Sequence, residues 1–179
     1  MLANKTIVLG VTGGTAAYKA ADLASKLIQA GATVQVVMTE AATKFLAPLT
    51  MRSITNQPVV ADMWELASKY NVRHVSLAEA ADVVVIAPAT ANTIAKLAAG
   101  IADNMLGCVV LATRAPVIVA YAMYDNMFQN PVTRENVAKL KARGFSFISP
   151  EDDPLAFPRA RMATSEMIIK AIEQVLERK

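Results

Sequence analysis

The sequence has few residues that could cross-link the chain or hold a metal ion. It contains one cysteine, Cys108, and one histidine, His74. A single thiol cannot form an intramolecular disulfide, and one thiol with one imidazole is too small a ligand set for a structural zinc site. We therefore expect a reducing, cytoplasmic setting and no metal site. Cys108 lies in the apolar stretch 106–111 and is expected to be a buried core thiol.

The sequence also lacks long hydrophobic runs and clusters of basic residues. The longest apolar stretches, residues 83–89 and 115–123, are far shorter than the ~20 residues of a membrane-spanning helix. The N-terminal residues do not show the pattern of an export signal. The 18 basic and 15 acidic residues give a formal net charge of +3, spread along the chain, so we expect no membrane or nucleic-acid partner.

What the sequence does have is a high apolar fraction in a chain of one-domain length. Hydrophobic residues make up 54% of the 179 residues and charged residues only 18%, which excludes a disordered or collagen-like protein. We expect a single domain over residues 1–179. The low charge and the nine methionines suggest more apolar surface than one small core can bury, so a homo-oligomer is expected.

Apolar runs alternate with helical patterns along the chain. The runs are rich in β-branched residues, which is typical of strands buried on both faces of a parallel sheet. The alternation predicts a doubly wound α/β fold with helices on both faces. The expected strands are 6–11, 33–38, 82–86, 116–120 and 145–148, and the expected helices are 16–30, one from residue 40, 91–99, 131–143 and one capped by Thr164 or Ser165.

Ligands of such sheets bind at the carboxyl ends of the strands, where three segments stand out. The loop at Gly13 and Gly14 precedes a helix and is either a phosphate site or a tight turn with nothing bound. Residues 87–93 carry more hydroxyl and amide groups than one helix cap needs, which favours a polar ligand such as a flavin. Residues 121–131 fit a binding site or a surface loop equally well, and His74 is either structural or catalytic.

Five motifs follow one another along nearly the whole chain. They are Gly13-Gly14-Thr15-Ala16-Ala17-Tyr18-Lys19, Arg73-His74-Val75-Ser76-Leu77, Pro88-Ala89-Thr90-Ala91-Asn92-Thr93, Ala102-Asp103-Asn104-Met105-Leu106, and Ala122-Met123 with Met127 and Asn130-Pro131. Together they resemble the motifs of the FMN-dependent cysteine decarboxylases. That family includes phosphopantothenoylcysteine decarboxylase of coenzyme A synthesis and the peptidyl-cysteine decarboxylases that modify lantibiotic precursors.

The resemblance implies a flavodoxin-like Rossmann subunit, a three-layer α/β/α fold with a parallel sheet. It also implies a trimer or dodecamer with FMN held between neighbouring subunits. In the family reaction the flavin oxidises the cysteine of a small-molecule or peptide substrate to a thioaldehyde, and loss of carbon dioxide leaves an enethiolate. The implied reaction-centre residues are His74, which assists proton movement, and Met127. The implied FMN contacts are Gly13, Gly14, Thr15, Thr39, Ala89, Thr90, Ala91, Asn92, Thr93 and Met123.

Two positions depart from the family pattern. Tyr124 stands where the family has the asparagine that resembles a holder of the substrate carboxylate, and Asn126, two residues on, is the candidate substitute. Phe157 stands where the coenzyme A enzymes have a flap cysteine. The leading expectation is FMN-dependent decarboxylation of 4'-phosphopantothenoylcysteine. The alternatives are an oxidative peptidyl-cysteine decarboxylase that stops at the enethiol and an FMN-binding flavoprotein that does not decarboxylate.

Overall fold

The computed structural model describes residues 2–64, 73–149 and 162–177. Its strands are all parallel and form one sheet in the order β3-β2-β1-β4-β5-β6. The edge strand β3 has only two residues, and without it the order is that of flavodoxin-like sheets. The predicted flavodoxin-like α/β fold is therefore confirmed. The strands are β1 (Thr6–Val11), β2 (Thr33–Met38), β3 (Val59–Val60), β4 (Val83–Ala89), β5 (Val117–Tyr121) and β6 (Ser146–Ile148).

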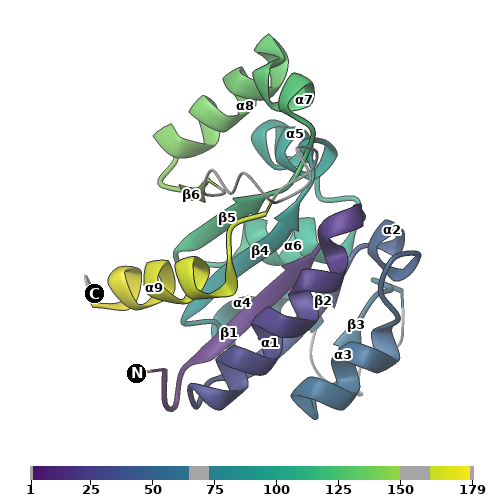
Figure 1. Cartoon of the computed structure of the whole chain (residues 1–179), viewed down its shortest axis with the longest axis vertical. Helices are drawn as coiled ribbons and strands as arrows, with labels where there is room; N and C mark the ends of the chain where they lie inside the picture. Colours follow the sequence, from purple (N-terminus) through teal and green to yellow (C-terminus); the bar gives the residue numbers. More distant parts are fainter. Residues whose placement is uncertain (1, 65–72, 150–161, 178–179) are drawn as a thin grey trace.

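Helices cover both faces of the sheet, with α1 and α9 in front of it and α4 and α6 behind it in Figure 1. The helices with residues in the core of the first face are α1 (Lys19–Gln29), α3 (Pro48–Thr55) and α9 (Ser165–Leu176). Those of the second face are α4 (Arg73–Ala80), α5 (Ala91–Ala99), α6 (Met105–Ala112) and α8 (Pro131–Ala142). Among the described residues, no helix is both long and apolar enough to cross a bilayer.

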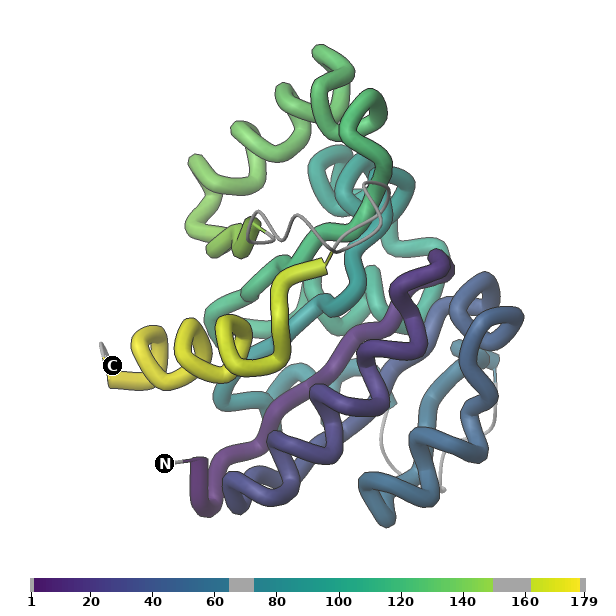
Figure 2. The backbone as a smooth tube through the Cα atoms, in the orientation of Figure 1, coloured from purple at the N-terminus to yellow at the C-terminus, as the bar shows by residue number. Residues whose placement is uncertain are grey.

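Side chains of each strand alternate between these two cores. In β1, Ile7 and Leu9 join the core of the first face and Val8 joins that of the second. Figure 2 follows the chain from β1 into α1, which lies beside α9 although the two helices come from opposite ends of the sequence. The short helices η1 (Thr15–Tyr18), α2 (Glu40–Thr43) and α7 (Asp125–Gln129) follow the carboxyl ends of β1, β2 and β5.

Two sequence-based element assignments need correction. The strand expected over 82–86 continues to Ala89, because pairing with β5 resumes at Ala89 and Tyr121 after a register shift. The helix expected over 16–30 begins as the 3-10 turn η1 and becomes α-helical only at Lys19.

Helix α6 was not predicted, because its sequence is apolar on all sides and shows no helical stripe. It packs so close to β1 that a Cβ on Gly10 would lie 2.5 Å from Cδ1 of Leu106. The expectation that Cys108 is a buried core thiol is wrong. Cys108 lies on α6 and is only half-buried, with its Sγ 3.5 Å from the carbonyl oxygen of Ala102.

Candidate functional site

A cavity of about 440 Å³ opens where the order of the strands reverses, at the carboxyl ends of β1 and β4. Ligands of doubly wound sheets bind at this point of the fold, and sites for small molecules have volumes of roughly 300–1,000 Å³. The cavity therefore has the place and the size of a ligand site. It is lined by Gly13, Thr39, Glu40, Ala41, Thr90, Ala91, Asn92, Thr93, Lys96, Asp103, Asn104 and Met127.

Many of the residues predicted to contact FMN meet in this cavity. Those that line it are Gly13, Thr39, Thr90, Ala91, Asn92 and Thr93, together with Met127. Gly14 and Thr15 follow Gly13 at the start of η1 but are not among the described lining residues. Ala89 and Met123 are buried in the core of the second face, and neither lines the cavity of the described chain.

The structure places the other predicted reaction-centre residues outside the lining of this cavity. His74 lies half-buried in the first turn of α4 and does not line the cavity within the described part of the chain. Tyr124 precedes α7 and Asn126 lies on it, and both side chains are exposed. Phe157 falls outside the described residues.

Helix α7 is held at the cavity by an aromatic pair. The rings of Tyr121, the last residue of β5, and Phe128 of α7 are stacked with centroids 4.2 Å apart and planes 5° apart. A stack of this kind fixes the rotation of a short helix against the sheet. Met127, next to Phe128, thereby lines the cavity although 47% of it is exposed.

The two glycines of the first loop are present for different reasons. A Cβ on Gly13 would overlap the Cβ of Ala41 and lie 2.7 Å from its carbonyl carbon, so packing against α2 requires a glycine there. A Cβ on Gly14 would meet only Cγ2 of Thr90 at 3.7 Å, an ordinary contact. The loop is thus narrow at Gly13 and open at Gly14, a distinction that the sequence did not reveal.

Thr12 connects this loop to the end of β4, and sequence reasoning missed it. Its buried hydroxyl donates to the carbonyl oxygen of Pro88 at 2.8 Å and accepts from the backbone N–H of Thr90 at 3.0 Å. Both hydrogen bonds span the switch point of the sheet. Thr12 therefore holds the two strand ends that form the floor of the cavity in a fixed relation.

Two predicted threonines act as helix caps. The Thr39 hydroxyl accepts from the N–H of Ala42 at the start of α2, and the Thr90 hydroxyl accepts from the N–H of Thr93 at the start of α5, each at 3.2 Å. Asn92, in the first turn of α5, is not needed as a cap and is exposed in the cavity lining. The positive end of α5 and a spare amide therefore face the cavity, an arrangement that suits an anionic or polar group.

A charged pair completes the wall, and sequence reasoning assigned it no role. Lys96 Nζ on α5 lies 2.5 Å from Oδ2 of Asp103. The hydrogen bond from Lys96 lowers the pKa of the Asp103 carboxyl. Asn104 caps α6 through its Oδ1, 2.9 Å from the N–H of Gly107, and its Nδ2 lies 3.5 Å from Oδ1 of Asp103. The spacing of Asn92 and Lys96, four residues apart on one helix, was the available signal.

Curated relatives share much of this sequence. A coenzyme A biosynthesis bifunctional protein CoaBC of Bacillus subtilis is 42% identical over 177 residues, covering 97% of this chain and 44% of that protein. The chain thus spans less than half the length of this relative. A probable phosphopantothenoylcysteine decarboxylase of Streptococcus mutans is 40% identical over 178 residues, covering 97% of this chain and 99% of that protein.

Solved structures share the fold over nearly the full chain. The FMN-dependent cysteine decarboxylase SpaF is 31% identical with a TM-score of 0.87, covering 98% of this chain and 99% of that one. A PPC decarboxylase mutant complexed with pantothenoylaminoethenethiol is 32% identical with a TM-score of 0.83, covering 97% of this chain and 98% of that one. The profile of the flavoprotein family matches residues 1–177. The chain therefore belongs to the flavoprotein family.

Proposed function

We propose that this protein binds FMN and decarboxylates 4'-phosphopantothenoylcysteine, a step of coenzyme A synthesis. The observation that carries the proposal is the cavity at the switch point, which gathers most of the residues expected to contact FMN. Relatives named for coenzyme A biosynthesis and for this decarboxylation support the choice of reaction.

The residues of the cavity fit the chemistry of FMN. Hydroxyls of Thr39 and Thr90, the amide of Asn92 and the N-terminus of α5 suit the ribityl and phosphate groups. Ala41 and Met127 offer apolar contacts to a ring system. When bound, FMN supplies the two-electron oxidation that turns the substrate cysteine into a thioaldehyde, the electron sink for loss of carbon dioxide.

In this proposal His74 moves a proton of the substrate. Since His74 does not line the cavity of its own described chain, the proposal places it in the site of a neighbouring subunit. Exposed apolar side chains favour such an assembly: Leu49 is 70% exposed and Trp64 is 82% exposed. We propose a homo-oligomer, a trimer or a dodecamer, that works in the cytoplasm.

One sequence of assays tests the proposed function. The purified protein is expected to be yellow and to release FMN on denaturation, identified by chromatography against FMN and riboflavin. The FMN-loaded protein is then expected to release carbon dioxide from 4'-phosphopantothenoylcysteine. A colourless protein that takes up no added FMN contradicts cofactor binding, and a flavin-loaded protein that releases no carbon dioxide contradicts the reaction.

A second candidate function rests on Tyr124. This exposed tyrosine occupies the position of the expected carboxylate-holding asparagine, which favours a different substrate or a flavoprotein without decarboxylase activity. We expect Tyr124→Asn to raise carbon dioxide release from 4'-phosphopantothenoylcysteine, because an amide can donate two hydrogen bonds to a carboxylate. Unchanged release, with flavin content matched between variant and parent, would assign carboxylate binding to another residue.

A further inference from the structure

The ionisable side chains that line the cavity among the described residues are Glu40, Lys96 and Asp103. Their formal charges sum to minus one. A phosphate monoester carries a charge between about −1.5 and −2 at neutral pH, so this lining without Lys96 would repel it. Lys96 is thus the one cation of the described lining, and an anionic ligand depends on it.

Lys96 is also placed where an anion would already be favoured. It lies one helical turn after Asn92 on α5, so the ammonium and the first turn of the helix face the same cavity. Asp103 holds the ammonium at 2.5 Å through one of its three donors. Two donors of Lys96 therefore remain for a ligand, and Asp103 keeps the side chain oriented while offsetting part of its charge.

We propose that Lys96 binds a phosphate monoester in this cavity and that Asp103 positions Lys96 and tempers its affinity for that group. The inference rests on the proposed function, whose cofactor and whose substrate both end in a phosphate monoester. It assigns opposite effects to the two members of one ion pair. Loss of Lys96 weakens phosphate binding, and loss of the Asp103 charge strengthens it.

The first arm of the test measures flavin binding by fluorescence titration of the apoprotein with FMN and with riboflavin, which lacks the phosphate. If the flavin phosphate is the ligand, Lys96→Met raises the Kd of FMN about tenfold and leaves that of riboflavin unchanged. Asp103→Asn lowers the Kd of FMN by roughly threefold, again without an effect on riboflavin.

The second arm measures the KM of the FMN-loaded protein for 4'-phosphopantothenoylcysteine and for pantothenoylcysteine, its unphosphorylated counterpart. If the substrate phosphate is the ligand, the same shifts of opposite sign are found in KM for the phosphorylated compound alone. The two arms thus separate the two sources of the phosphate.

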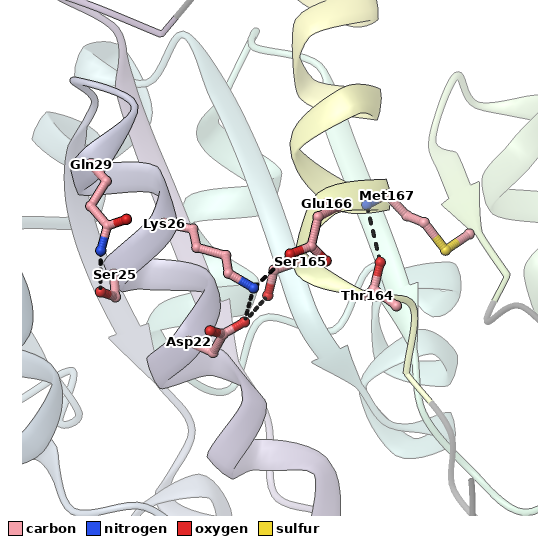
Figure 3. Close-up of polar contacts among 8 residues, drawn as sticks. All are labelled: Asp22, Ser25, Lys26, Gln29, Thr164, Ser165, Glu166 and Met167. Atoms are coloured by element: carbon pink, nitrogen blue, oxygen red, sulfur yellow. Dashed lines mark hydrogen bonds and ion pairs between the residues drawn. The ribbon is translucent and has the colours of Figure 1, made fainter. Parts of the chain in front are cut away.

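Lys26→Met is the matched control. Lys26 is also paired with carboxylates, Asp22 and Glu166, but none of these three residues lines the cavity (Figure 3). This control is expected to leave every Kd and KM ratio unchanged.

Two results would overturn the assignment. One is a Lys96→Met variant with unchanged ratios in both arms. The other is a pair of variants that weaken phosphorylated and unphosphorylated ligands alike, which is what a purely structural ion pair predicts. A parent protein that binds neither flavin overturns the proposed function itself, whereas binding of both flavins with unaltered ratios in both arms overturns only the role of Lys96.

Discussion

Two lysine clusters of this protein have the same chemistry in different surroundings. Lys26 of α1 lies 2.9 Å from Asp22 and 2.6 Å from Glu166, and Ser165 donates to Asp22 at 2.6 Å (Figure 3). This network joins α1 to the start of α9. Lys96 has one carboxylate partner, Asp103, and lines the cavity at the carboxyl edge of the sheet.

The comparison shows that the place of an ion pair, and not its composition, decides what it can do. Hydrogen bonds from Ser165 and Lys26 lower the pKa of Asp22, and those with Glu166 and Asp22 raise the pKa of Lys26. These groups satisfy one another and leave no charge for a ligand. The wall at Lys96 has an incomplete set of partners and faces an open cavity, which is what a binding site needs.

The largest expected effect concerns the reaction itself. We expect His74→Asn to keep its bound flavin and to lose turnover by a factor of about 10²–10⁴, the usual contribution of a general acid or base. The measurement is carbon dioxide release at matched flavin content. Turnover equal to that of the parent would make the imidazole structural and would move the comparison away from the carboxyl edge.

The next effect separates the two glycines of the cavity loop. Gly13→Ala is expected to lower the free energy of unfolding by about 1–3 kcal/mol and to weaken FMN binding, because the added methyl overlaps Ala41. Gly14→Ala is the matched control and is expected to change little, since its Cβ has room. Urea denaturation and flavin titration measure both quantities. Equal losses in the two variants would show that the loop does not have one narrow and one open position.

The smallest effect tests the network of α1 and α9. Ser165→Ala removes a hydrogen bond to the Asp22 carboxylate, and we expect a loss of stability below about 1 kcal/mol, because the Asp22 side chain is 57% exposed. The pKa of Asp22 is lowered from 3.8, so this contribution is present at neutral pH and lost as the pH falls through the lowered value.

Urea denaturation at neutral pH and in acid below 3.8 measures this difference. Ser25→Ala is the control, since Ser25 accepts from Gln29 on the same helix and does not contact a carboxylate in the described structure. A stability difference between Ser165→Ala and the parent that persists unchanged in acid would contradict the role of Asp22. FMN binding is expected to be unaffected in both variants, in contrast to the variants at Lys96.

The sequence alone was sufficient for the main elements of the fold. The apolar runs at 6–11 and 33–38 are strands with the predicted bounds, because strands buried on both faces have little choice of residue. Helix α6 could not be recognised, since a short apolar segment has no periodicity that separates helix from strand. The two-residue strand β3 is too short to leave a pattern in the sequence.

For the site, the sequence indicated the polar segment after β4 and the loop after β1, because both follow strand ends. It could not show that Thr12 bridges them or that Ala41 crowds Gly13, since these contacts join segments distant in the chain. The pairing of Lys96 with Asp103 was equally hidden.

The amino-acid pattern by itself determined that this chain forms a parallel sheet covered by helices, because local apolar periodicity is a property of consecutive residues. Only the tertiary structure decided which side chains share the cavity and which lysine faces it. The physical reason is that charge and space at a point depend on every segment that reaches it, and here strand ends and helix starts from four parts of the chain meet in one place.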